Sequence, residues 1–414
     1  MMSNRVTTTR NTGYGERLGN SFKKILWGII LVIVSIALLA RNENNFVEQK
    51  AALKEGEKNV ISTSPTPLDS SLEGKLVYFN GETSSPAEKL VDQDFNILTD
   101  DLKLIRNVEM YQWKEDSEED CHDNYGGGEE CTTTYDYRKV WEDQPIDSSR
   151  FYQEEGHRNP THRAYSSKTL EKKPILVWDY QLASDFTNQL TKADPLVLKG
   201  QDIHIPEEYQ TWAVAQANLD LFDDELAFED DASQPKKRLH ILENELYLWY
   251  NPNEPRIGDL KIGFSTVPSG MVSVVGQQAG KTLVSHTTSN ARSIALLELG
   301  TVPVQTMFAH AHAENALMTW FFRFLGLILM YAGFSMLFEF VVTLLKVIPP
   351  LANVVEAGTS IVALALTFVV GLGTIAIAWI VVRPVIGIPL LLVALGVGAY
   401  LLWNKRNKKT DSQE

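Results

Sequence analysis

Cysteine is almost absent from the sequence, with two residues, Cys121 and Cys131, among 414. Two thiols are too few for the disulfide framework of a small secreted domain or for a zinc site made of cysteines alone. An excess of basic residues is also absent, since the formal net charge is -14 at pH 7. Nucleic-acid-binding proteins need Lys and Arg to replace condensed counterions, so the charge excludes a basic module of that kind.

Recognisable catalytic motifs are missing as well. The sequence contains no phosphate-binding loop, no Gly-x-Ser-x-Gly elbow, no His-Glu-x-x-His pair and no dinucleotide-binding fingerprint. These chemistries depend on particular residue types at fixed spacing, and no such set is present. We therefore expect a protein that is not an enzyme and that carries neither a cofactor nor a catalytic metal.

Long apolar runs are present near both ends of the chain. Residues 25–40 carry no charge and would extend about 24 Å as a helix, and the lysines before them can snorkel to complete a span. The run is long for a signal peptide and lacks an Ala-x-Ala cleavage site, which favours an uncleaved anchor. Three further runs near the C-terminus are each long enough to span a bilayer. We expect transmembrane helices at 25–40, 318–345, 360–382 and 383–403, with a short interfacial loop at 346–359.

The basic residues predict an orientation. Residues 1–24 have a net charge of +4, and the tail at 404–414 is also basic. Four spans place both termini on one side, and positively charged flanks favour the cytoplasmic side. Residues 41–317 contain 26 Lys and Arg against 47 Asp and Glu, so this part is strongly acidic. We expect cytoplasmic ends at 1–24 and 404–414 and an acidic domain on the opposite side.

The acidic part divides into a charged stalk at 41–68 and a β-rich domain at 69–317. Mixed Glu and Lys residues with few large apolar side chains predict a charged helix in the stalk. Beyond it, short segments rich in β-branched and aromatic residues alternate with turn residues. The fold class predicted is a membrane protein of α+β type. Strands are expected at 75–79, 108–113, 132–137, 196–198, 239–241, 246–250, 260–264 and 271–275, and helical patterns at 180–190, 290–298 and 310–318.

The two cysteines lie ten residues apart around Gly126, Gly127 and Gly128. A disulfide would pin an acidic hairpin tip and is permitted outside the cytoplasm. Two free thiols on a surface loop are an alternative, and a metal site is the weakest reading, with only His122 nearby. The surrounding Asp and Glu residues could attract Ca²⁺, but their spacing is not that of an EF-hand, so we interpret them as a solvated loop.

Charged residues inside the expected spans are a further candidate site. Arg323 lies near the outer end of its span and can snorkel. Glu339 lies sixteen residues further on, about 24 Å along a helix, so the two cannot pair directly. Glu339 points into the helix bundle or to the inner interface, or it lines a polar path. Arg383, followed by Pro384, predicts a tight hairpin between the last two spans.

Several strings resemble those of the transmembrane protein 43 family, also called LUMA. The most specific is Glu-Met-Tyr-Gln-Trp at 109–113, and the resemblance covers most of the chain. The family motif residues are Gly74, Lys75, Glu109, Met110, Tyr111, Gln112, Trp113, Gly156, His157, Asn159, Pro160, Gly258 and Asp259.

The resemblance implies four spans with a large domain between the first and the second. It also implies a multi-pass scaffold that organises membrane protein complexes through self-association, at the nuclear envelope and endomembranes of eukaryotic relatives. The expected partners are the lipid bilayer, further copies of the chain and other membrane or envelope proteins. The location would be the inner membrane in a bacterium, or the endoplasmic reticulum and inner nuclear membrane in a eukaryote. The alternative function is a channel or transport accessory that uses polar residues in the helix bundle.

Overall fold

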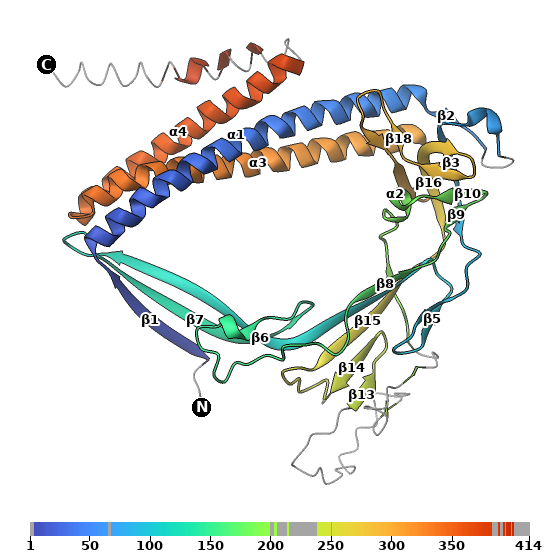
Figure 1. Cartoon of the computed structure of the whole chain (residues 1–414), viewed down its shortest axis with the longest axis horizontal. Helices are drawn as coiled ribbons and strands as arrows, with labels where there is room; N and C mark the ends of the chain where they lie inside the picture. Colours follow the sequence, from blue (N-terminus) through green and yellow to red (C-terminus); the bar gives the residue numbers. More distant parts are fainter. Residues whose placement is uncertain are drawn as a thin grey trace, which may run out of the picture.

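The computed structural model contains three long helices and two large β-sheets (Figure 1). The helices are α1 (Tyr14–Asn59), α3 (Val304–Leu345) and α4 (Pro349–Val382). They run close together, and the β-sheets form an arch that meets them at both ends. The structure describes residues 4–64, 68–198, 203–204, 213–214, 238–249 and 251–382, and nine positions between 388 and 400.

Helix α1 joins two segments that the sequence analysis separated. The apolar run at 25–40 and the charged stalk that begins at 41 form one continuous helix as far as Asn59. No proline interrupts it, and the stalk is rich in Ala, Glu and Lys, which are strong helix formers. The helix is therefore far longer than a bilayer is thick, at about 69 Å.

The connection between α3 and α4 is shorter than expected. The interfacial loop predicted at 346–359 shrinks to residues 346–348, because α4 begins at Pro349. Proline is tolerated in the first helical turn, where its missing N–H has no intrahelical partner to lose. The two prolines therefore start the helix instead of extending the loop.

Three described helices are long and apolar enough to cross a membrane, within Tyr14–Asn59, Val304–Leu345 and Pro349–Ile380. They contain the expected spans at 25–40, 318–345 and 360–382. The fourth expected span, 383–403, is not supported as a span, and most of it lies outside the described residues. Arg383 and the tail at 404–414 also lie outside them.

Helices α1 and α3 pack as an antiparallel pair. At their crossing, a Cβ atom added to Gly28 would lie 2.8 Å from the backbone oxygen of Gly333, so glycine permits the close approach. Small residues at such contacts are characteristic of helix association in membranes, where apolar burial gives little driving force. Leu39, Met330 and Phe334 are buried around the crossing with Ala363 of α4.

The large β-rich region predicted by the sequence is confirmed. Its nine-stranded sheet has the strand order β1, β7, β6, β15, β14, β13, β12, with β11 beside β15 and β8 beside β6. A core of Val108, Met110, Leu246 and Ile262 lies in this sheet. The bounds are β1 Arg5–Thr12, β6 Lys103–Asp123, β7 Glu129–Glu142, β8 Lys168–Glu171, β11 Asp194–Pro195, β12 Ala213–Val214, β13 Arg238–Ile241, β14 Glu245–Trp249 and β15 Leu260–Val267.

The seven-stranded sheet has the order β2, β3, β9, β10, β17, β16, β20, with a further β3–β16 pairing. Its strands are β2 Ile61–Ser62, β3 Leu76–Ser84, β9 Leu176–Val177, β10 Tyr180–Leu182, β16 Met271–Ala279, β17 Thr282–Val284 and β20 Leu296–Leu299. Two small ladders pair β4 Leu90–Asp92 with β5 Ile97–Thr99, and β18 His286–Thr287 with β19 Ser293–Ile294. The short helices are η1 Ser70–Leu72, η2 Ser148–Arg150 and α2 Ser184–Thr187.

Three local predictions were wrong. The expected helix at 290–298 contains β19 and most of β20, because its apolar residues pack as edge strands against α1 and α3. The expected helix at 180–190 is helical only in α2 and begins with strand β10. The expected strand at 196–198 is irregular, and the pairing with β15 comes from residues 194–195.

Strand β1 is an element that the sequence analysis missed. It pairs antiparallel with β7 over its whole length, from Arg5 opposite Asp136 to Thr12 opposite Glu129. Together β1, β7 and β6 make a long three-stranded ribbon that leaves the body of the sheet and ends at the N-terminal end of α1 (Figure 1). Residues 5–12 therefore belong to the same sheet as much of the region at 69–317.

Candidate functional site

The tip of the β6–β7 hairpin is a tight turn closed by a disulfide. Cys121 and Cys131 lie directly opposite each other in the ladder, with a Cα–Cα distance of 4.0 Å, and their sulfurs are bonded. Gly126 and Gly127 have φ angles of 94° and 85°, which favour glycine. A Cβ on Gly127 would also lie 2.3 Å from the ring of Tyr14, so this glycine lets the tip approach α1.

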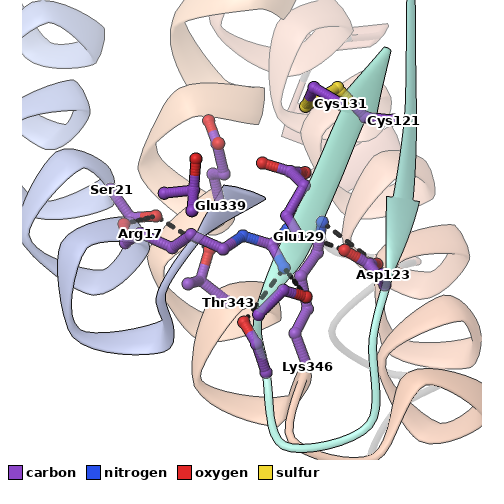
Figure 2. A network of polar contacts seen from close by, with 12 residues as sticks. Arg17, Ser21, Cys121, Asp123, Glu129, Cys131, Glu339, Thr343 and Lys346 are labelled. Carbon is purple, nitrogen blue, oxygen red and sulfur yellow. Dashed lines mark hydrogen bonds and ion pairs between the residues drawn. A yellow bond between two sulfur atoms is a disulfide. The ribbon is translucent and has the colours of Figure 1, made fainter. Parts of the chain in front are cut away.

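The hairpin tip binds the adjoining ends of α1 and α3, and we call this set of contacts the clasp (Figure 2). Its centre is Arg17 of α1, which is 7% exposed. One guanidinium nitrogen, Nη1, donates to the backbone oxygens of Gly127 and Gly128 at 3.1 and 3.2 Å. The other, Nη2, donates to Glu129 at 2.9 Å and lies 2.7 Å from Asp123 Oδ1, an ion pair without hydrogen-bond geometry.

Helix α3 completes the clasp. Lys346 Nζ lies 3.3 Å from the second oxygen of Asp123, so this carboxylate faces a cation from each helix. The backbone N–H of Gly126 donates to the oxygen of Val347 at 3.1 Å, and the hydroxyl of Tyr14 donates to the oxygen of Leu344 at 3.2 Å. The tip is therefore held by charge and by backbone hydrogen bonds together.

Next to the clasp, further along α1, two polar pairs join α1 and α3 directly. Ser21 and Thr343 share a buried hydrogen bond of 2.8 Å between their hydroxyls. Lys24 Nζ lies 2.5 Å from a carboxylate oxygen of Glu339. The intramembrane Glu339 of the sequence analysis therefore pairs with a lysine that precedes the first apolar run.

The second intramembrane charge, Arg323, is paired as well. It donates to both carboxylate oxygens of Glu43, at 2.6 and 2.7 Å, and its guanidinium lies 4.7 Å from the ring centre of Trp320. Trp379 of α4 donates its indole N–H to the same carboxylate at 2.6 Å. Glu43 is 1% exposed. An ion pair between the buried Glu43 and the partly buried Arg323, with the indole of Trp379, thus ties the three helices together.

At the opposite end, α1 and α3 enter the β region. Leu53, Ile294, Met307 and Phe308 form a buried apolar cluster between the helices and the seven-stranded sheet. Close packing continues at Gly56, where an added Cβ would lie 2.5 Å from the side chain of Ile294. We call this contact the sheet end of the helix pair.

Several family motif residues gather at the base of the hairpin. The amide of Gln112 donates to the oxygen of Gln144 at 2.7 Å and accepts from the N–H of Ile146 at 2.8 Å. Asn159 accepts from the N–H of Trp113 at 2.7 Å and donates back to the oxygen of Trp113 at 2.8 Å. These side chains fasten the loop after β7 to strand β6.

His157 is buried in the same place. Its ring stacks on Tyr137 at 3.9 Å between centres and meets the edge of Trp113 at 4.8 Å. The hydroxyl of Tyr137 donates to Glu115 at 2.7 Å. Burial, followed by this hydrogen bond to a carboxylate, raises the pKa of Tyr137 to about 12. Gly156, with φ of 84°, forms the turn before the histidine.

A second buried polar group involves Asp259. The hydroxyl of Tyr247 donates to its Oδ2 at 2.5 Å, and the N–H of Arg256 donates to the same oxygen at 2.8 Å. Burial raises the pKa of Asp259, and burial together with the neighbouring carboxylate raises the pKa of Tyr247. Gly258, with φ of 99°, lets the chain turn beside Pro160, and its N–H donates to the oxygen of Tyr111.

The remaining motif residues have structural positions. Met110 is buried in the core, whereas Glu109 is exposed opposite Lys261 on β15. Gly74 has φ of 72° and leads into β3, and the oxygen of Lys75 accepts a hydrogen bond from the N–H of Gln278.

One cluster of possible metal ligands is found among the described residues. It contains Glu119, Cys121 and Cys131, and its two sulfurs are bonded to each other. Thiolates are the cysteine form that binds metals, so the disulfide state does not suit a metal. A groove of about 370 Å³ between α3 and α4 is lined by Glu339, Lys346 and Glu356, among others.

The main residues that sequence reasoning missed are the partners of the charges it found. Glu43 was assigned to the stalk, Arg17 was counted among the basic residues that predict the orientation, and Lys346 was placed in the interfacial loop. A signal for Glu43 was available, because antiparallel helices place the residues after one span beside those that begin the next. Glu43 follows the first apolar run by three residues, and Arg323 follows the start of the second by about as many.

Known proteins resemble this sequence over almost its whole length. A family model described as Transmembrane protein 43 matches residues 110–384. A transmembrane protein 43 homolog of Drosophila melanogaster is 29% identical over 406 residues, which cover 95% of this chain and 96% of the relative. Transmembrane protein 43 of Homo sapiens is 25% identical over 396 residues, 92% of this chain and 90% of the relative.

No solved structure matches the chain. The family model covers well over half of the sequence, including the string at 109–113 from Met110 onward, and three helices are apolar enough to cross a bilayer. The chain is therefore an integral membrane protein and belongs to the transmembrane protein 43 family.

Proposed function

We propose that the chain is a non-enzymatic membrane scaffold that associates with further copies of itself and presents its β region to other membrane or envelope proteins. The observation that carries the proposal is the rigid connection between the helices and the sheets. A scaffold must transmit position from the bilayer to a binding surface, and the helix pair enters the β region through a buried core. Domains joined in this way do not move independently.

Exposed apolar side chains on the helices support self-association. Ile33 of α1 is 61% exposed and Phe324 of α3 is 61% exposed, and neither is covered by the β region. In a bilayer such side chains contact either lipid or another helix. Small residues and polar groups nearby favour contact with another helix. The scaffold reading assigns part of this surface to a second copy and the rest to lipid.

The proposed location follows the family resemblance and the charge pattern. We propose the endoplasmic reticulum and inner nuclear membrane as the location in a eukaryote, and the inner membrane as the location in a bacterium. We also place both termini in the cytoplasm, which requires the run at 383–403 to cross the bilayer as a fourth span. The basic residues before the first apolar run support this orientation.

Crosslinking in native membranes tests self-association. A cysteine at Ile33, treated with a short bismaleimide, should link two copies. The native cysteines should not react, because they are bonded to each other. The matched control is a cysteine at Leu39, which is 0% exposed and packs against Gly326 inside the pair, and it should not link. A strict monomer in mild detergent, with no link from any exposed position, would remove the proposal.

The channel or transport alternative has less support. It requires Arg323 and Glu339 to line a polar path, whereas both form ion pairs with α1. The groove between α3 and α4 keeps it testable, because Glu339 contributes to that lining. The test measures ion flux into liposomes that contain either the parent protein or Glu339→Gln. A flux in the parent that the substitution changed would replace the scaffold proposal with this alternative.

A further inference from the structure

The clasp and the sheet end hold the same two helices at opposite ends. Arg17 at the clasp and Leu53 at the sheet end are 36 residues apart on α1, which is about 54 Å along the helix axis. The apolar run at 25–40 lies between them. A bilayer crossed by α1 at this run would therefore separate the clasp from the sheet end.

The ribbon that connects these two places cannot follow α1 through lipid. Strand β6 has 21 residues, about 70 Å, and it carries Glu118, Glu119 and Asp120 exposed along its outer half. Charged side chains and unpaired sheet edges are excluded from lipid-exposed positions in the hydrocarbon. A closed clasp and a bilayer-spanning α1 consequently exclude each other within one molecule.

The residues of the clasp nevertheless suit both situations. On the helix side, Arg17 and Lys346 present two cations at adjoining helix ends, close to the exposed Lys24. On the hairpin side, Asp123 and Glu129 supply the carboxylates that face them. Cations at the ends of membrane helices also bind the phosphates of anionic lipids at the surface.

We propose that the clasp is one state of a two-state element in which the acidic hairpin tip and anionic lipid phosphates compete for Arg17 and Lys346. The inference rests on the proposed spanning role of α1 and α3. When the helices cross a bilayer, the tip separates from them, β1 leaves β7, and the two cations contact phosphates on the opposite face. When the helices do not cross, the tip replaces the phosphates and the ribbon closes.

The strand pairing of β1 with β7 belongs to the closed state alone. Lipid phosphates can replace Asp123 and Glu129 at the cations, but they do not replace the strand pairing of β1 with β7. The closed state therefore has a structural readout, the register of Thr9 opposite Thr132, that lipid binding alone does not produce.

A cysteine crosslink reads out the two states. The full chain with Thr9→Cys and Thr132→Cys is treated with a short bismaleimide, and mass spectrometry detects the linked peptides. We expect the link in detergent-solubilised protein and its loss in sealed native membranes. The control pair is Glu82→Cys with Met271→Cys, which are exposed partners in β3 and β16 and should link under both conditions.

Labelling from one side distinguishes failure of this inference from failure of the scaffold proposal. In sealed vesicles, an impermeant maleimide should reach Cys introduced at Thr9 and Cys introduced at Thr132 from opposite sides. An undiminished link in membranes, or labelling of both positions from the same side, would overturn the two-state element. Neither result depends on whether copies of the chain associate.

A lipid titration identifies the competitor. Adding an anionic phospholipid to the detergent micelles should lower the yield of the Thr9–Thr132 link, and a zwitterionic phospholipid at the same fraction should not. Arg17→Gln with Lys346→Gln should remove the difference between the two lipids. Equal effects of both lipids on the parent protein would contradict competition for the cations.

Discussion

At the sheet end, α1 and α3 are held by Leu53, Phe308 and their neighbours in a buried apolar core. At the clasp, the same helices are held by Arg17 and Lys346 through ion pairs and backbone hydrogen bonds. Apolar burial is favourable wherever water is the alternative, whereas a cation can exchange one anionic partner for another. The difference indicates that the sheet end is the fixed joint and that the clasp is the exchangeable one.

The largest expected effect comes from the fixed joint. Phe308→Ala removes a 1%-exposed ring from the cluster at the sheet end and should destabilise the protein by about 3–5 kcal/mol. The measurement is guanidinium unfolding in detergent, followed by tryptophan fluorescence. Phe321→Ala, on the same helix with a ring 59% exposed, is the control and should change the midpoint little. Equal losses in both variants would show that the sheet end is not a packed joint.

The clasp should respond less. Arg17→Gln leaves Asp123 and Glu129 without their shared guanidinium and should cost about 1.5–3 kcal/mol in detergent, where we expect the clasp to be closed. Lys24→Gln is the matched control, because its pair with Glu339 is about half exposed and such pairs contribute about 0–1 kcal/mol. If the two substitutions had the same effect, burial of Arg17 would not matter and the comparison between the ends would fail.

Two glycines of α1 should respond with opposite signs. Gly56→Ala places a methyl group against Ile294 and the ring of Phe308, so we expect a loss of about 1 kcal/mol or more. Gly19→Ala has nothing within 4 Å of the added atom, and alanine is the better helix former, so it should add about 0.5–1 kcal/mol. The thermal midpoints in detergent check both signs. A stabilising Gly56→Ala would mean that the sheet end is loosely packed.

An effect confined to high pH is expected at the base of the hairpin. The pKa of Tyr137 is raised in the folded protein to about 12 from an ordinary value of 10.0, so the neutral phenol is favoured on folding. The stabilisation is complete below pH 10 and is lost as the pH rises through 12. The free energy of unfolding should fall between pH 10 and pH 12, and the fall should be smaller in Tyr137→Phe. An unchanged profile in Tyr137→Phe would contradict this, and Tyr125→Phe at the 84%-exposed tip is the control.

Much of the β region could be predicted because its signals are local. Strand β15 alternates buried residues at Leu260, Ile262 and Phe264 with less buried ones, which is the period of a half-buried strand. The string at 109–113 is specific to the family, and its Gln112 and Trp113 make hydrogen bonds at the hairpin base. Residues 290–298 looked helical because a short apolar run does not distinguish a helix from an edge strand.

The clasp could not be predicted from the sequence because its parts are distant. Strand β1 reads Arg-Val-Thr-Thr-Thr-Arg-Asn-Thr, a polar segment without an apolar face, and only its pairing with β7 makes it a strand. Arg17 gave a clear charge signal, but a positive charge near an apolar run is usually interpreted as an orientation signal. The pair of Glu43 and Arg323 was within reach, because burial of an arginine in a span requires a counter-ion.

The position of β1 at the start of the chain has a consequence for biosynthesis. Strand β1 and helix α1 leave the ribosome before β7 exists, because more than a hundred residues separate β1 from its partner. At typical rates of synthesis this delay is on the order of ten seconds. During that time α1 can meet a translocation machinery while β1 is still single. Insertion of α1 during this interval would therefore place the N-terminus before the ribbon can form.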